Sequence, residues 1–162
     1  MAFSITTNES LNKEGKYRLL LNQIDALIES ENNIIANLGN TASALKYSMD
    51  NFLWTGFYLT ENENELVLGP FQGRVACTRI KFGEGVCGAA AERRETVIVH
   101  DVDKFPGHIV CDSMSRSEIV VPIIKEDKTL GALDIDSDIL SNFDDTDKFY
   151  LEKIVQKLLK IF

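Results

Sequence analysis

Apolar residues recur every three or four positions in two stretches of the first fifty residues and again near the C-terminal end. This spacing places them on one side of a helix, which predicts three amphipathic helices packed against a core. Gly39 weakens the second helix, predicted at residues 32–47, because glycine is a poor helix former. Three carboxylates, Asp144, Asp145 and Asp147, suit the positive end of the last helix's dipole. The apolar stripes comprise Tyr17, Leu20, Leu21, Ile24, Leu27 and Ile28, then Ile34, Leu38, Ala42 and Leu45, and finally Leu151, Ile154, Val155, Leu158, Leu159 and Phe162.

Between these helices the pattern changes to short apolar and aromatic runs, which are typical of strands. Residues 52–59 carry apolar or aromatic side chains on both alternating faces of the predicted strand, so we expect a central strand covered on both sides. Residues 101–117 have no regular pattern, and irregular segments of that length are often functional. The order of elements predicts one α+β domain over residues 1–162 with a mostly antiparallel sheet. The other predicted elements are strands at residues 66–68, 75–80, 96–99, 119–124 and 129–135 and a short helix at residues 89–94.

The composition is that of a soluble globular protein, with 44% apolar and 26% charged residues among 162. The 17 basic and 25 acidic residues give a net charge of −8 without a basic cluster, so we expect neither nucleic acid nor an anionic membrane as partner. The longest apolar run, residues 119–124, is too short to span a bilayer. Residues 1–8 lack the basic and long apolar regions of a signal peptide, so we expect a cytoplasmic protein.

Three glycines, Gly83, Gly85 and Gly88, match the G-x-G-x-x-G pattern of dinucleotide-binding turns. Asp103 follows about twenty residues later, where such sites carry an acidic residue. The helix predicted after the turn is short, however, and the strands before it form hairpins rather than βαβ units. A tight turn that needs positive φ is the better interpretation, and we expect no bound cofactor.

The three cysteines have several interpretations. Structural disulfides are rare in a reducing cytosol, which leaves buried thiols, metal ligands or redox chemistry. Three cysteines and two histidines would suffice for zinc, but no pair has the usual C-x-x-C or H-x-x-x-H spacing, and we expect no metal site. The residues available to zinc are Cys77, Cys87, His100, His108 and Cys111.

Redox chemistry has some support from the positions of the cysteines. Cys87 lies where the glycine turn meets a helix N-terminus, and helix dipoles there lower a thiol pKa. Cys111 lies in the long irregular segment, three residues after His108. Cys77 falls within a predicted strand, where a thiol is often only a small packed apolar group.

Two carboxylates, Asp134 and Asp136, share one face of an otherwise apolar predicted strand. Like charges this close repel unless a cation lies between them, and a ligand's ammonium group would serve. Glu118 opens another predicted strand and could be the third member of the group. The alternative is that this face of the strand is exposed to solvent.

Six segments together resemble the free methionine-(R)-sulfoxide reductases, a family of single-domain proteins with a GAF fold. The likeness covers nearly the whole chain, and the three cysteines on this framework are its specific part. The six segments are Trp54-Thr-Gly-Phe-Tyr58, Leu68-Gly-Pro-Phe-Gln-Gly73, Gly83-Glu-Gly-Val-Cys-Gly88, His100-Asp-Val, Glu118-Ile-Val-Val-Pro122 and Gly131-Ala-Leu-Asp-Ile-Asp-Ser137.

The resemblance implies a GAF fold in which the N- and C-terminal helices pack on one face of the sheet. It implies reduction of free L-methionine-(R)-S-oxide to methionine, with thioredoxin as electron donor and dimerisation through the N-terminal helices. Cys111 corresponds to the attacking thiol, and Cys77 and Cys87 to the two thiols that can resolve it. Glu118, Asp134 and Asp136 correspond to the acidic residues that hold the substrate. Trp54 and Tyr58 correspond to the aromatic wall of the site.

The residue types suit this chemistry. A protonated Glu118 could supply the proton that the sulfoxide oxygen needs as a thiolate attacks its sulfur. Cys111 would become a sulfenic acid, which condenses with a second thiol to a disulfide. The rival hypothesis is a GAF sensor that binds a small ligand without catalysis. Such sensors usually feed an output domain, and the sequence ends at Phe162 without one, so we expect the enzyme.

Overall fold

The computed structural model describes residues 4–162. Residues 1–3, part of the N-terminal stretch predicted to lack the features of a signal peptide, lie outside the described residues. The three amphipathic helices predicted from the apolar stripes are present, and Gly39 does not interrupt the second. The side chains of Asn12, Asn33 and Asp144 cap the three helices by accepting hydrogen bonds from backbone N–H groups of the first turn. The helices are α1 (Lys13–Ser30), α2 (Ile34–Ser48) and α4 (Asp145–Leu158).

Six strands form one sheet in the order β3-β2-β1-β6-β5-β4, and every pairing is antiparallel. This confirms the α+β class with its antiparallel sheet. Strands β1 and β6 lie at the centre, where each is paired on both sides. The strands are β1 (Trp54–Asn62), β2 (Glu65–Gln72), β3 (Arg79–Lys81), β4 (Val97–Val99), β5 (Ser117–Lys125) and β6 (Lys128–Ser137).

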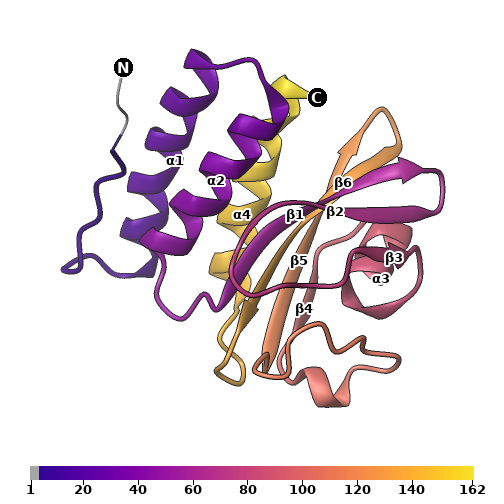
Figure 1. Cartoon of the computed structure of the whole chain (residues 1–162). Coiled ribbons are helices and arrows are strands. Elements are labelled where there is room, and N and C mark those ends of the chain that lie inside the picture. The colour runs from indigo at the N-terminus through magenta and orange to yellow at the C-terminus, as the bar shows by residue number, and fades with distance from the viewer. Residues whose placement is uncertain (1–3) are drawn as a thin grey trace.

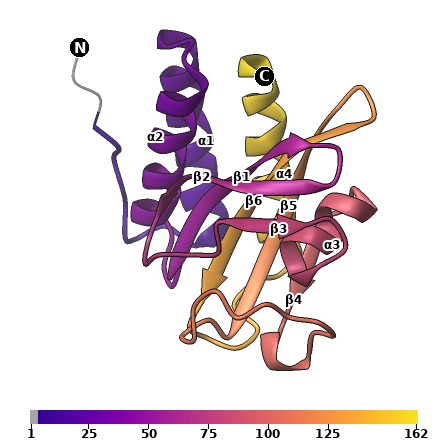
Figure 2. The same cartoon turned by 45° about the vertical axis from the view of Figure 1, so that its right-hand side comes forward.

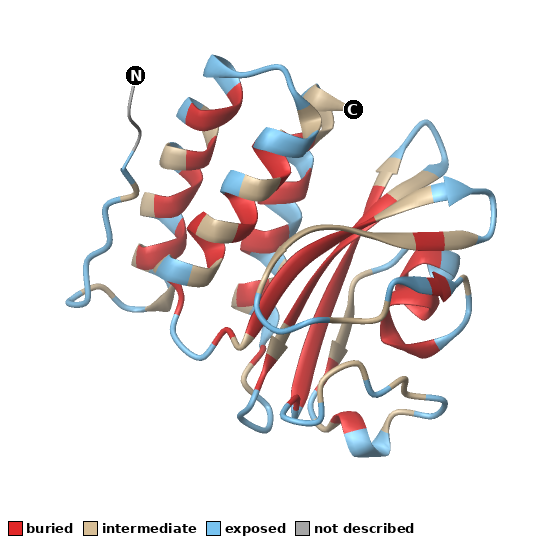
Figure 3. Ribbon diagram, in the orientation of Figure 1, coloured by how far each residue is buried: buried red, intermediate tan, exposed pale blue. Residues whose placement is uncertain are grey.

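The two faces of the sheet are covered differently (Figures 1 and 2). Helices α1, α2 and α4 lie together on one face, as the resemblance implied. The other face is covered by α3 (Gly85–Arg93) and by the connections before β3 and before β5, the second of which contains the short helix η1 (Val102–Lys104). The chain ends in the turn η2 (Leu159–Ile161). Figure 3 shows that the central strands are buried along most of their length.

Strand β1 confirms the prediction of a strand covered on both faces. Phe57 packs with the three long helices, whereas Trp54 and Tyr58 belong to the core on the opposite side. None of the helices within residues 4–162 has both the length and the apolar character that crossing a bilayer requires.

Two predicted elements were placed wrongly. The strand predicted at residues 75–80 is shorter, because residues 73–78 form a loop in which Val75 is 87% exposed. Helix α3 begins within the glycine turn rather than at residue 89. Gly83 and Gly85 have φ values of 84° and 60°, as expected of a tight turn, and a Cβ at Gly88 would collide with the carbonyl oxygen of Lys81.

Candidate active site

Three carboxylates gather on the face of the sheet that α3 covers. Glu118 of β5 is opposite Asp136 of β6, and Asp134 lies two residues before Asp136 on the same strand. Because side chains alternate along a strand, all three point to the same side of the sheet. Glu118 and Asp134 are only 6% and 7% exposed, so this face is not the solvated one that the sequence left open.

Burial dominates the electrostatics of these groups. It raises the pKa of Glu118 well above its usual range, and the neighbouring carboxylates of Asp134 and Asp136 raise it further. Burial and Asp136 raise the pKa of Asp134 in the same way. The pKa of Asp136 is raised by burial to about 6, although the Ser115 hydroxyl donates a hydrogen bond to this carboxylate. The cluster therefore favours proton uptake or a bound cation over three free negative charges.

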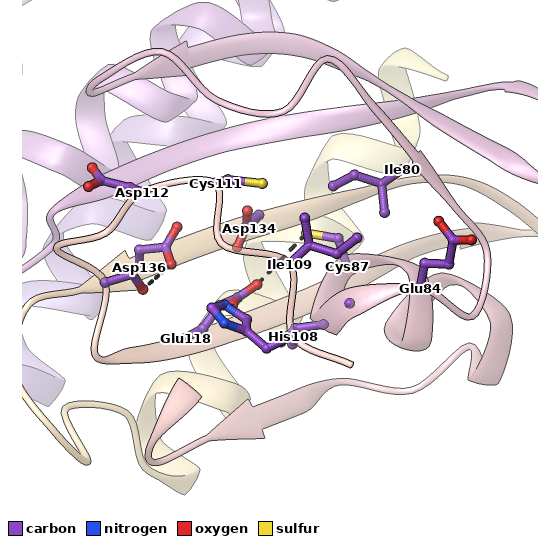
Figure 4. A pocket seen from close by; sticks show the side chains of 13 residues that line it. Ile80, Glu84, Cys87, His108, Ile109, Cys111, Asp112, Glu118, Asp134 and Asp136 are labelled. Atoms are coloured by element: carbon purple, nitrogen blue, oxygen red, sulfur yellow. Dashed lines mark hydrogen bonds and ion pairs between the residues drawn. The ribbon is translucent and has the colours of Figure 1, made fainter. Parts of the chain in front are cut away.

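The first turn of α3 brings Cys87 to this cluster (Figure 4). Its Sγ lies 3.9 Å from Oε1 of Glu118, and the residue is 4% exposed. Burial raises the pKa of this thiol, and the charges of Asp134 and Glu118 raise it further. The expectation of a lowered pKa at the helix N-terminus was therefore wrong, because desolvation and two acidic neighbours outweigh the dipole.

The other two cysteines form a disulfide. Cys77 and Cys111 are 34 residues apart in sequence, and their Cα atoms are separated by 5.3 Å. Cys77 lies in the loop of residues 73–78 and not in a strand, so both sulfur atoms belong to irregular segments. All three cysteines lie within the described residues, and Cys87 is the one left free. A disulfide between Cys77 and Cys111 removes both thiolates that a zinc site at these positions would require.

The aromatic side chains Trp54 and Tyr58 position the Cys77 loop. Trp54 Nε1 donates to the carbonyl oxygen of Arg74 at 3.0 Å, and the Tyr58 hydroxyl donates to that of Cys77 at 2.9 Å. Gly56 lies between them on the same face, where a Cβ would lie about 2.5 Å from the Trp54 ring. Both aromatic residues are buried beside the carboxylates, but neither is among the residues that line the cavity described next.

A cavity of about 30 Å³ lies between the carboxylates, α3 and the Cys111 segment. It is far smaller than the roughly 300 Å³ or more of most small-molecule sites. His108 approaches the cluster, with Nε2 at 3.8 Å from Oε2 of Glu118, and burial lowers the pKa of its imidazole. The sequence considered His108 only as a zinc ligand and a neighbour of Cys111. It assigned no site role to the other lining residues outside the cluster, of which Gly85 was noted only as part of the glycine turn. These are Ile80, Glu84, Gly85, Val86, Ile109, Asp112 and Ser115.

The glycine turn lacks the surroundings of a dinucleotide site. Helix α3 has nine residues and leads into β4, an edge strand that pairs antiparallel with β5. Dinucleotide-binding turns instead belong to parallel βαβ units. The turn places Cys87 against Glu118, and the backbone N–H of Gly83 closes it by donating to the carbonyl oxygen of Gly88 at 2.9 Å.

The chain is similar to proteins of known family along nearly its whole length. Residues 38–158 match the GAF domain family. GAF domain-containing protein A of Dictyostelium discoideum is 56% identical over 90% of this chain and 92% of its own. The free methionine-R-sulfoxide reductase of Saccharomyces cerevisiae is 46% identical over 96% and 91%. The crystal structure of free methionine-R-sulfoxide reductase from Neisseria meningitidis, in complex with its substrate, is 46% identical, covers 98% of this chain and 96% of that one, and superposes with a TM-score of 0.93.

Proposed function

Because the chain belongs to the free methionine-R-sulfoxide reductases of the GAF domain family, we propose that it reduces free L-methionine-(R)-S-oxide to L-methionine with its own thiols. The observation that carries this proposal is the disulfide between Cys77 and Cys111 at the edge of a cavity lined by buried carboxylates. An oxidised cysteine pair next to carboxylates suited to an ammonium group is the expected product of a thiol-dependent reduction.

The free amino group of the substrate accounts for the carboxylates. An ammonium ion between Asp134 and Asp136 would neutralise charges that burial otherwise disfavours. A methionine sulfoxide within a peptide lacks that ammonium group. The same two carboxylates would therefore select the free amino acid over a peptide-bound residue.

Glu118 and Cys111 would carry the first chemical step. The raised pKa of Glu118 favours its protonated form, which can donate a proton to the sulfoxide oxygen. The Cys111 thiolate attacks the substrate sulfur and forms a sulfur–sulfur bond. The protonated oxygen then passes from the substrate sulfur to Sγ as the sulfur–oxygen and sulfur–sulfur bonds break, so methionine leaves and Cys111 becomes a sulfenic acid. Two electrons pass from the cysteine sulfur to the substrate sulfur.

Cys77 would carry the second step. Its thiol attacks the sulfenic acid sulfur of Cys111, and a disulfide forms with release of water. The observed pairing supports Cys77 rather than Cys87 as the resolving residue. A dithiol protein of the thioredoxin class would then return both cysteines to thiols in two exchange steps, and the oxidised reductant would carry away the two electrons.

The closed cavity indicates an order for these steps. With the disulfide in place, about 30 Å³ does not accommodate an amino acid of methionine's size. We therefore expect methionine to leave before reduction and new substrate to bind only after it. Reducing thiols at each turnover requires a reducing compartment, which supports a cytoplasmic location.

The decisive experiment is incubation with racemic free methionine sulfoxide and dithiothreitol, followed by separation of the diastereomers. The (R) form should disappear, while the (S) form and N-acetylmethionine sulfoxide persist. Comparable turnover of the N-acetyl compound would overturn the role of the carboxylates. A protein that only senses a ligand would leave every form intact.

Association through α1 and α2 is part of the same proposal. Ile35 and Tyr47 of α2 are 53% and 74% exposed, which supports a contact with a second copy. Analytical ultracentrifugation of the protein and of an Ile35→Asp variant would test it. A monomeric wild-type protein would overturn this part and leave the proposed reaction unaffected.

A further inference from the structure

Three different elements bring metal-binding atoms together beneath α3. Cys87 Sγ, a carboxylate oxygen of Glu118 and one of Asp134 all lie within 4.8 Å of one another, and all three residues are buried. Figure 4 shows the three side chains directed toward one another across the cavity. Since one belongs to a helix and two to adjacent strands, their positions are fixed by the fold rather than by a flexible loop.

The cluster contains an unsatisfied acceptor. Asp134 Oδ1 is buried and accepts no hydrogen bond of ordinary geometry within residues 4–162. The donors that approach this carboxylate are the Cys87 thiol and the protonated Glu118, whose protons a metal ion would replace. The basic group that approaches is His108, 3.8 Å from Glu118, and burial favours its neutral form by lowering its pKa. A buried carboxylate oxygen without a hydrogen bond of good geometry is costly, and a cation bound among these three side chains would remove that cost.

The distances suit a zinc ion. Zinc–sulfur and zinc–oxygen bonds of about 2.3 and 2.0 Å at a tetrahedral angle separate the two ligand atoms by about 3.5 Å. Cys87 Sγ and Glu118 Oε1 are 3.9 Å apart, a few tenths of an ångström beyond this spacing. The Asp134 oxygen lies within 4.8 Å of both, so its side chain would need to approach by up to about 1.5 Å. A thiolate with two carboxylates favours zinc over magnesium or calcium, which prefer oxygen ligands alone.

We propose that Zn²⁺ binds Cys87, Glu118 and Asp134, with water in the fourth position, and excludes free methionine sulfoxide from the cavity. The inhibitory consequence rests on the proposed function, because the ion would occupy carboxylates that otherwise receive the substrate's ammonium group. Zinc binding displaces protons from the thiol and the carboxyl groups and involves no electron transfer. The site would make the reductase sensitive to free zinc.

The test uses Co²⁺ as a spectroscopic substitute for zinc. In the oxidised protein Cys87 is the single free thiol, so a thiolate-to-cobalt charge-transfer band must come from it. A Cys77→Ser, Cys111→Ser double variant again leaves Cys87 as the single thiol but lacks the disulfide beside the cavity. We expect one equivalent of Co²⁺ to give the band in at least the double variant, and Zn²⁺ to abolish it.

Two further variants test the ligand set. Cys87→Ala in the double-variant background should remove the band, and Asp134→Asn should weaken Co²⁺ binding at least tenfold. Circular dichroism shows whether each variant is folded. No band in either thiol-containing protein would overturn the proposal without reference to any variant, and a band that survives Cys87→Ala would overturn it as well.

Competition separates this inference from the proposed function. Free (R)-methionine sulfoxide should displace Co²⁺ from the double variant, which can bind the substrate but lacks the reacting thiols. The (S) diastereomer is the matched control, because it chelates dissolved cobalt equally well. A band that neither form displaces would leave the metal site intact and contradict its overlap with the substrate. Absence of turnover by the wild-type protein would contradict the proposed function alone.

Discussion

The two faces of the central sheet bury side chains of opposite character. On the face toward α1, α2 and α4, β6 places Leu133 and Ile135, both 0% exposed, in a core of apolar side chains, and the buried carboxylate of that side, Asp147, is paired with Lys13. On the other face the same strand places Asp134 and Asp136 beside a buried thiol. Alternate residues of one strand therefore lie in two environments, one apolar and one acidic, although both are buried.

This difference indicates that the helical face contributes most of the folding stability and that the carboxylate face provides the chemistry. Burying a leucine or isoleucine contributes about 1.5–3 kcal/mol, whereas a buried carboxylate without a counterion opposes folding. The apolar core on the helical face is continuous through three helices and the sheet. Its burial therefore offsets the unfavourable free energy of burying carboxylates on the other face. Raised pKa values on the second face are the sign of groups kept for binding or catalysis rather than for folding.

The largest expected effect is on the carboxylate face, at the disulfide. Cys111→Ser should abolish methionine formation even in a single turnover, because no thiolate attacks the sulfoxide. Cys77→Ser should keep a burst of one equivalent and lose cycling with thioredoxin. Rapid quench with quantification of methionine measures both. Neither variant should lower the free energy of unfolding of the reduced protein by more than about 1 kcal/mol.

Cys87→Ser is the control for this assignment. The variant keeps the residues that pair in the structure, so mass spectrometry after sulfoxide addition should still find a disulfide between Cys77 and Cys111. If Cys111→Ser retained the burst and Cys87→Ser lost it, the attacking role would belong to Cys87, and the separation of thiol roles argued above would be wrong.

A neighbouring pair on β6 tests the comparison itself. Leu133→Ala should lower the free energy of unfolding by about 2–5 kcal/mol through loss of packing, with KM for the sulfoxide unchanged. Asp134→Asn should raise KM markedly and leave stability at neutral pH unchanged or higher, because a buried charge is removed. Urea denaturation and steady-state kinetics measure the two quantities. Equal effects of both substitutions on stability would contradict the division between the faces.

The pH dependence of stability should have opposite signs on the two sides. The folded state raises the pKa of Asp136 from 3.8 to about 6, so its stabilising contribution is present at about pH 4 and lost as the pH rises through about 6. Burial opposes ionisation of Asp144 on the helical side, but Lys13 and the helix N-terminus lower its pKa to about 2. That contribution is lost as the pH falls from about 4 to 2.

Two substitutions separate these effects. Asp136→Asn should make the decline of unfolding free energy between about pH 4 and 6 less steep, with Glu118 and Asp134 responsible for the remainder, and leave the acid side unchanged. Asp144→Asn should do the reverse. Urea unfolding at half-unit pH intervals measures both slopes. A decline above pH 4 that Asp136→Asn leaves intact would assign it to groups other than this carboxylate.

Much of the fold could be predicted because its signals are local. The spacing of apolar residues in α1 and β6 predicts which of their residues are buried. The alternation along β6 also places Asp134 and Asp136 on the same side of the sheet. The loop at Val75 was missed because an apolar run looks like a strand. The structure instead fixes this segment through distant groups, the Tyr58 hydroxyl and the Cys111 sulfur.

The site itself depends on tertiary contacts that periodicity does not encode. The sequence left open which cysteine pairs with Cys111, since that depends on a spatial distance between two irregular segments. The helix N-terminus suggested a low pKa for Cys87, but Glu118 and Asp134 approach it from strands more than thirty residues away. His108 enters the site for the same reason, through the path of the segment before β5.

The smallest expected effect concerns the surface around the disulfide. Redox encounters bury about 600 Å² per partner, a patch of about 14 Å radius, and Val75 lies within about 7 Å of Cys77 along the backbone. A protein reductant that reaches the disulfide should therefore cover Val75, which is 87% exposed. Val75→Asp should raise KM for thioredoxin about fivefold, equivalent to about 1 kcal/mol, and leave dithiothreitol-supported turnover unchanged. Phe149→Asp, an exposed position of α4 on the helical side, should change neither. An equal rise in both variants would mean that net charge, and not the face on which the disulfide lies, governs the encounter.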